Sequence, residues 1–252
     1  ALNYVNQPAT KIITVEDPVE YRLERVNQVQ VHPRIGLDFG RVLRTALRQD
    51  PDIILVGEMR DRETVDIGLR AAMTGHLVFS TLHTVSAVAT ANRLLDMGAP
   101  GYLIGAALQG IVAQRLVRRV CESCAEPHEL SPGESAWLKA QIGSKRATGA
   151  TLVQGRGCNY CQLTGYRGRI GVYELLEMDS GLTDALRRED LSDFVSLAAQ
   201  KKTYVPLVNC ALDYAMSGIT SLEEVIRIAG GPDGEYELDV DEAQVSNEVA
   251  DG

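Results

Sequence analysis

Asp52-Ile53-Ile54-Leu55-Val56-Gly57-Glu58-Met59-Arg60-Asp61 is the stretch that decides the fold of this chain. Four branched apolar residues in a row are too few for a helix and too continuous for a half-exposed strand. They predict a strand that is buried on both faces, as in parallel α/β sheets. Because ligands in such sheets bind at the carboxyl ends of the strands, Glu58 is a candidate site residue. A strand followed by a solvated acidic turn is the simpler alternative.

Three further strands and several helices are expected on either side of this stretch. Lys11–Val15 predicts a strand that ends in the acidic turn 16–20, and 76–83 predicts another. An exposed-edge strand is expected at 28–31, and helices at 38–48, 62–73 and 86–97 have apolar residues at helical spacing. Strands that alternate with helices in this way are typical of a doubly wound α/β domain.

Charged or hydroxylic residues follow each of three predicted strands. They are Glu16, Asp17 and Glu20 after the first, Glu58 and Asp61 after the second, and Thr81 and His83 at the end of the third. If the strands are parallel neighbours, these turns converge on one crevice. Carboxylates there would hold Mg²⁺ and its waters or activate an attacking water, and His or Thr would contact a terminal phosphate. His76 stands at the start of its strand, far from His83, and is expected to have a supporting or intersubunit role.

Four of the five cysteines form two Cys-x-x-Cys pairs, Cys121/Cys124 and Cys158/Cys161. Two such pairs can present four thiolates tetrahedrally to Zn²⁺ and leave no coordination position open for catalysis, so we expect structural zinc. A redox dithiol pair and an iron–sulfur cluster are the alternatives, and the charged surroundings favour neither.

The chain of 252 residues carries a net charge of −9, but eight acidic and no basic residues follow Pro232. The remainder is close to neutral, with 5% aromatic residues, which argues against a nucleic-acid binder. The tail at 230–252 is expected to be disordered. Neither a signal peptide nor a membrane-spanning apolar run is present in the sequence, so the chain is expected in the cytoplasm.

The rest of the chain predicts a smaller set of elements. The Ala-, Leu- and Val-rich residues 101–120 suggest a mostly buried helix, and 169–178 suggest a returning strand. Another helix is expected to start at Ser131, and short helices are expected at 183–188, 190–199, 205–216 and 222–228.

Three segments together resemble the secretion ATPase superfamily, the hexameric motors of type II secretion and type IV pilus assembly. Residues 14–21 resemble its Asp box, 50–61 its atypical Walker B motif and 73–84 its His box. The paired cysteines resemble the zinc subdomain of its secretion and pilus-extension branch. The resemblance covers about residues 10–229, and three boxes in order make it specific.

The resemblance implies a RecA-like P-loop ATPase core at 1–119, a tetracysteine zinc subdomain at 120–170 and a helical C-terminal subdomain at 171–229. It implies that Glu16 activates water, with Asp17 and Glu20 shaping the metal shell. It also implies that Glu58 reaches Mg²⁺ through water and that His83 lies near phosphate. Candidates for charge compensation between subunits are Arg22, Arg25, Arg60 and Arg70.

One departure from the family is the absence of a Walker A sequence, G-x-x-x-x-G-K-[ST]. Residues 1–4 resemble the end of the helix that follows that loop, so the chain is expected to be the C-terminal part of a longer ATPase. Alone, it should be nearly inactive, because the loop supplies most phosphate contacts.

The resemblance implies an ATP- and magnesium-dependent motor of a type IV pilus or type II secretion system, with a slight preference for pilus extension, of the mannose-sensitive haemagglutinin type. It also implies a hexamer that works on an inner-membrane platform protein, peripheral to that membrane. A RecA-like nucleic-acid motor and a non-catalytic zinc interaction module are the alternative functions.

Overall fold

The computed structural model describes residues 1–230. It divides the chain into two compact units, each built from two segments. Among the described residues, the first unit contains 1–114 and 173–207, and the second contains 115–172 and 208–230. The predicted tail lies outside the described residues except for Gly230. The division predicted from the family resemblance, into an ATPase core at 1–119, a zinc subdomain at 120–170 and a helical subdomain at 171–229, stays a prediction.

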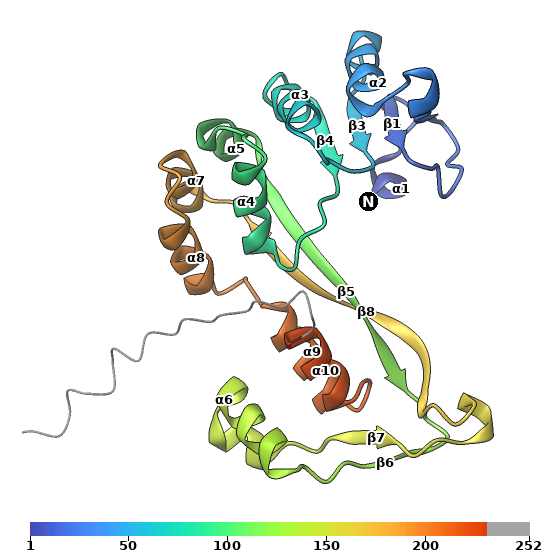
Figure 1. Cartoon of the computed structure of the whole chain (residues 1–252), viewed down its shortest axis with the longest axis vertical. Helices are drawn as coiled ribbons and strands as arrows, with labels where there is room; N and C mark the ends of the chain where they lie inside the picture. The colour runs from blue at the N-terminus through green and yellow to red at the C-terminus, as the bar shows by residue number, and fades with distance from the viewer. Residues whose placement is uncertain (231–252) are drawn as a thin grey trace, which may run out of the picture. The chain divides into compact units, whose positions relative to one another are not determined.

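A four-stranded parallel sheet forms the centre of the first unit (Figure 1). Its order is β2 (Val26–Gln30), β1 (Ile12–Glu16), β3 (Ile53–Val56) and β4 (Leu77–Ser80). The register pairs Val15 with Val56 and Val56 with Ser80. The prediction of a parallel α/β sheet around 53–56 is therefore confirmed.

Burial explains why the apolar run forms a central strand. Ile54 and Val56 of β3 are fully buried, and so is Val15 of the neighbouring β1. At β4, by contrast, Leu77 is 44% exposed, because that strand lies at the edge of the sheet. β4 is also shorter than predicted, since regular pairing covers only its four residues.

Five helices of the first unit, α2, α3, α4, α7 and α8, begin at a side-chain cap, whereas α1 and α5 do not. Asp38 accepts a hydrogen bond from the amide of Arg41 at the start of α2, and Ser86 accepts one from Ala89 at the start of α4. The helices are α1 (Leu2–Val5), α2 (Phe39–Ala46), α3 (Arg62–Met73), α4 (Ala87–Asp96), α5 (Gly101–Ala107), α7 (Ser180–Arg187) and α8 (Leu191–Gln200). Short 3-10 turns lie at Pro33–Ile35 and Leu47–Gln49.

The predicted helix at 101–120 is wrong beyond its first two turns. α5 ends at Ala107, and Gly110–Val120 form the strand β5, which pairs with β8 (Tyr166–Glu177). Ile111, Ala113 and Val117 of β5 are buried, while Val112 is 63% exposed. This alternation has the period of a strand, and Gly110 breaks the helical run ahead of it.

The second unit contains the cysteines and the last helices. Besides parts of β5 and β8, it has β6 (Ala125–Pro127) paired antiparallel with β7 (Val153–Gly155), the turn η3 (Asn159–Cys161), α6 (Pro132–Thr148) and α10 (Leu222–Ala229). α9 (Leu207–Met216) starts at the last residue of the first unit. The helix predicted to start at Ser131 is present and begins with a capping box between Ser131 and Glu134, and a non-helical Gly143 interrupts α6.

Candidate functional site

The carboxyl ends of β1, β3 and β4 lie at one edge of the sheet, and hydrogen bonds link the end of β1 and the residues after β4 to the turn after β3. The amide of Gly57 donates to the carbonyl of Val15 at 2.7 Å, and the amide of Met59 donates to the carbonyl of Thr81 at 3.1 Å. The Thr81 hydroxyl donates to the carbonyl of Gly57 at 2.5 Å. The parallel register and these bonds bring Glu16, Glu58 and Thr81 to the same edge.

Gly57 allows this close approach between the first two turns. A Cβ atom at Gly57 would lie 3.1 Å from the carbonyl oxygen of Val15 and 3.2 Å from the Cα of Glu16. Because both neighbours are backbone atoms, they cannot rotate away. The small residue before Glu58 therefore sets the separation between the two acidic turns.

Glu58 is the buried carboxylate of the site, with 8% of its surface exposed. Its Oε1 lies 2.5 Å from Nη2 of Arg60, and its Oε2 lies 3.3 Å from Nε2 of His83. The hydrogen bond from Arg60 lowers the pKa of Glu58 despite the opposing effect of burial, so the group is ionised at neutral pH. Within residues 1–230, Oε2 is buried and lacks a hydrogen bond of good geometry. A metal-bound water would satisfy such an oxygen, so the residues fit the predicted magnesium site.

Glu16 is held by two donors from the sheet. Its Oε1 accepts hydrogen bonds from the Thr14 hydroxyl at 2.5 Å and from Nε2 of Gln28 at 2.9 Å. Neither donor was predicted from the sequence. Thr14 lies two residues before Glu16 on the same strand face, and the register pairs it with Gln28 on β2. The first of these relations is visible in the sequence, whereas the second needs the register.

The other predicted site residues have varied environments. Asp17 and Glu20 are both exposed. The pKa of the Arg60 guanidinium is raised mainly by Glu58 and to a smaller extent by the charge of Asp17. Asp61 caps α3 by accepting from the amide of Thr64 at 2.8 Å. The predicted roles of Asp17, Glu20 and Asp61 in nucleotide binding stay predictions.

His76 and His83 are not brought together. His76 precedes β4 at the opposite edge of the sheet, and its Nδ1 lies 2.9 Å from the carbonyl oxygen of Ala71. His83 follows β4, and its side chain is 89% exposed beside Glu58. Of the two, only His83 is at the edge that carries the carboxylates.

Two of the four candidate arginines have partners in their own chain. Arg60 pairs with Glu58 at 2.5 Å, and Arg70 pairs with Asp66 of its own helix at 2.7 Å. Arg60 therefore belongs to the Glu58 environment, a role that the sequence did not reveal.

The four paired cysteines form a single cluster in the second unit. Their Sγ atoms all lie within 4.8 Å of one another. The separations are 4.0 Å for Cys121–Cys158, 3.8 Å for Cys124–Cys161 and 3.7 Å for Cys158–Cys161. Tetrahedral coordination with Zn–S bonds of about 2.3 Å separates the sulfur atoms by roughly 3.8 Å. The cluster therefore fits one zinc ion.

Backbone amides already surround these thiols. The amides of Cys158 and Gly165 donate to Sγ of Cys161 at 3.2 and 3.3 Å. Burial opposes ionisation of Cys161, but these donors outweigh it and lower its pKa, whereas burial raises the pKa of Cys124. A bound cation would favour the thiolate at all four positions.

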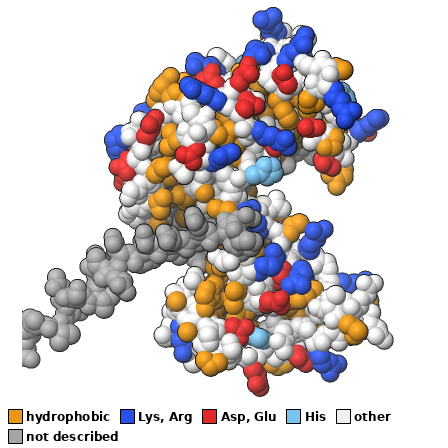
Figure 2. Space-filling model, viewed as in Figure 1, with side chains coloured by type: hydrophobic (Ala, Val, Ile, Leu, Met, Phe, Trp, Pro, Cys, Tyr) orange, Lys and Arg blue, Asp and Glu red, His pale blue; other side chains and the backbone are white. Residues whose placement is uncertain are grey.

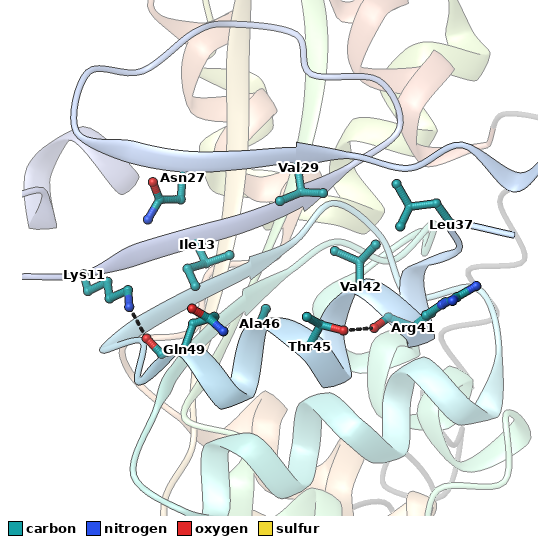
Figure 3. Close-up of a pocket in the computed structure, with 10 residues that line it drawn as sticks. All are labelled: Lys11, Ile13, Asn27, Val29, Leu37, Arg41, Val42, Thr45, Ala46 and Gln49. Carbon is teal, nitrogen blue, oxygen red and sulfur yellow. Dashed lines mark hydrogen bonds between the residues drawn. The ribbon is translucent and has the colours of Figure 1, made fainter. Parts of the chain in front are cut away.

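A cavity of about 400 Å³ lies away from both sites, between α2 and the strands β1 and β2 (Figure 3). Apolar side chains such as Ile13, Val29 and Val42 line it, with Lys11 and Arg41 among its polar residues. It contains none of the predicted site residues.

Comparison with known proteins gives a consistent result. The family model described as "Type II/IV secretion system protein" matches residues 1–227. Type II secretion system protein E of Dickeya dadantii is 42% identical over 229 residues, which are 90% of this chain and 44% of that protein. Type IV pilus assembly ATPase PilB of Pseudomonas aeruginosa is 44% identical over 227 residues, which are 90% of this chain and 40% of that protein. The chain thus spans less than half the length of these relatives.

Solved structures share the fold. The pilus retraction motor PilT with bound ADP aligns with a TM-score of 0.63 at 30% identity, over 92% of this chain and 56% of PilT. The Legionella pneumophila ATPase DotB aligns with a TM-score of 0.58 at 23% identity, over 86% of this chain and 51% of DotB. The predicted α/β ATPase fold is confirmed.

Proposed function

Because this chain belongs to the type II/IV secretion system protein family, we propose that it is the carboxylate-bearing part of an ATPase. The ATPase would power type IV pilus assembly or type II protein secretion. The proposal draws on relatives named for both systems, which are 42% and 44% identical to the chain. For either system, the chemistry that we propose for this protein is ATP hydrolysis coupled to movement of the protein.

The observation that carries this proposal is the joining of three strand-end turns at one edge of the sheet. Glu16, at the end of β1, and Glu58, just after β3, therefore lie at the same edge of the sheet. Nε2 of His83 lies 3.3 Å from Oε2 of Glu58. Bound magnesium would neutralise charge on the β- and γ-phosphates of ATP. Glu58 would hold a water of that ion, and Glu16, fixed by Thr14 and Gln28, would orient the attacking water.

The phosphate cradle would come from a segment outside these 252 residues. The sequence has no Walker A motif, and the relatives are more than twice as long as the matched region. Backbone amides and a lysine on the phosphates supply much of the nucleotide affinity in such sites. The chain by itself would therefore hydrolyse ATP near the background rate.

The assembly that we propose is a hexameric ring that works in the cytoplasm on an inner-membrane platform protein. Within the described part of the chain, none of the helices has the length and apolar character needed to cross a bilayer. We propose that the ring attaches to the membrane through that platform protein.

A nucleic-acid motor is a weaker proposal on the same fold. Such a motor needs a basic stripe and stacking aromatic residues. Acidic and basic side chains are interspersed on the face of the first unit that Figure 2 shows. Salt-dependent binding of DNA to the purified protein would favour that alternative.

Steady-state ATP hydrolysis by the full gene product that contains this chain tests the proposal. Glu16→Gln should lower kcat by about 10²–10⁴-fold, because general-base catalysis contributes that much. Glu24→Gln, an exposed carboxylate in the loop after β1, is the matched control and should retain the activity. Undiminished turnover in Glu16→Gln would leave the non-catalytic zinc module as the better interpretation.

A further inference from the structure

Glu174 is a buried carboxylate that the proposed ATPase site does not use. It lies on β8 within the first unit and is 1% exposed. Three donors from two distant segments converge on it. Oε1 accepts from the amide of Ala87 at 2.7 Å and the hydroxyl of Tyr204 at 2.8 Å, and Oε2 accepts from the amide of Leu207 at 3.0 Å.

The first segment is the one that carries His83. Ala87 is the first residue of α4, and residues 81–86 connect that helix to β4. We name residues 81–86 the His83 loop. At its start, Thr81 is bonded to Gly57 and Met59 of the turn that carries Glu58. At its end, the next amide is bonded to Glu174. The loop is thus fixed at both ends, once to the Glu58 turn and once to Glu174.

The second segment is the stretch through which the chain leaves the first unit. Leu207 is the last residue of that unit, and the chain continues into the second unit at Val208. Leu207 is also the first residue of α9. Glu174 therefore accepts from the first amides of two helices, where backbone N–H groups have no partner within the helix.

Burial makes these contacts interdependent. A buried carboxylate that loses a donor bears an uncompensated desolvation cost, so each segment is held in place by the position of the other. Ala87 and Leu207, at 0% and 3% exposure, leave little room for water to replace a lost bond.

We propose that Glu174 is a positioning residue, which fixes the His83 loop relative to Glu58 and couples that loop to the chain's exit from the first unit. The proposal rests on the proposed function for its catalytic consequence, but its structural part stands on the contacts alone. Glu174 does not touch the reacting groups. It converts a displacement of the His83 loop into a displacement at Leu207.

Amide hydrogen exchange on the 252-residue chain tests the structural part. Glu174→Gln replaces an acceptor oxygen by an NH₂ group that faces a donor, so exchange in 81–90 and 204–210 should quicken by about tenfold. Exchange at Val15 and Val56 in the sheet should not change. Glu177→Gln, an exposed carboxylate on the same strand, is the matched control.

Tyr204→Phe makes the test specific to coupling. It removes one donor to Glu174 without changing the Ala87 bond, and it should still quicken exchange in 81–90. Unchanged exchange in 81–90 in both variants would overturn the proposal. Uniformly faster exchange that includes the sheet would also overturn it, because that result describes a packing role only.

Kinetics of the full gene product test the catalytic consequence. Glu174→Gln should lower kcat by about tenfold while the KM for ATP stays within twofold, because a displaced His83 loop leaves the phosphate cradle intact. An unchanged kcat, or a rise in KM alone, would overturn this consequence. If the unmodified protein has no ATPase activity, the proposed function fails, and the exchange result still decides the structural part.

Discussion

At the residue scale, two glycines show how closely the backbone is packed around the cysteine cluster. Gly155 ends β7, and Gly165 lies just before β8. A Cβ atom at Gly155 would lie 2.0 Å from the carbonyl oxygen of Gly165, which also accepts from the amide of Cys121 at 2.9 Å. These backbone atoms cannot move without displacing a cysteine of the cluster.

Gly155→Ala should therefore destabilise the chain by about 2–3 kcal/mol or more, as severe overpacking does, and should weaken metal binding. Denaturant unfolding and zinc titration measure the two effects. Gly133→Ala is the control, because a Cβ atom there meets nothing within 4 Å. Equal behaviour of the two variants would show that the close approach does not matter.

Residue chemistry could be predicted from the sequence only where partners are near in sequence. The acidic turns and the paired cysteines are local patterns, and the structure brings both sets together. The role of Glu174 could not be predicted from the sequence, because its three hydrogen-bond donors are 30 to 87 residues away along the chain. Within the predicted strand it looked like one more alternating polar residue.

At the element scale, α10 is attached to β5 through the buried carboxylate of Glu224, which pairs with two partly exposed arginines. Glu224 of α10 is fully buried and accepts from the amide and Nε of Arg118 at 2.6 and 2.9 Å. It also accepts from Nε and Nη2 of Arg227, both at 2.9 Å. Arg118 further contacts Glu223 and lies over the ring of Tyr166. This network fixes the last helix to the strand.

The pH dependence of stability should reflect Glu224. Burial acts to raise its pKa, but the two arginines outweigh it and lower the pKa to about 2. Because the folded-state pKa lies below the unfolded value of about 4.3, the contribution is fully present above pH 5 and is lost as pH falls towards 2.

Glu224→Gln should cost roughly 3 kcal/mol at pH 7, because it leaves the arginines with a neutral partner, and progressively less below pH 4. Chemical unfolding of both proteins between pH 2.5 and 7 measures the difference. Glu122→Gln, whose carboxylate is 89% exposed, serves as control. A cost that does not vary with pH would contradict the assignment.

Strand β5 is the element whose type was predicted wrongly from the sequence pattern. The apolar residues at 101–120 were consistent with one buried helix, and short apolar runs cannot be told from strands by periodicity alone. The pairing of β5 with β8, some fifty residues later in the chain, stabilises the strand there. The parallel sheet was predictable because its buried strands and caps are local signals.

At the scale of the whole molecule, the chain combines two units with separate sources of stability. The first has the parallel sheet, whose central strands β1 and β3 are largely buried, whereas the cysteine cluster lies in the second. The free energy of metal binding contributes to the folding of the unit that holds the ion. Removal of the ion should therefore affect the two units differently.

Elemental analysis should find one zinc ion per chain, and chelation should loosen residues 121–165 before the sheet of the first unit. Hydrogen exchange with and without a chelator measures this order. A zinc content near zero would remove the metal centre, and simultaneous opening of β1 and β3 would contradict independent stabilisation.

The central claim is that Glu16 and Glu58, from separate strands, act on one magnesium-bound nucleotide. A double-mutant cycle on ATP hydrolysis by the full gene product, with Glu16→Gln, Glu58→Gln and the double variant, tests it most directly. If the two carboxylates act at one site, the double variant should be about as slow as the slower single variant. Two losses that multiply as independent factors, or a Glu58→Gln variant with unchanged turnover, would contradict the claim.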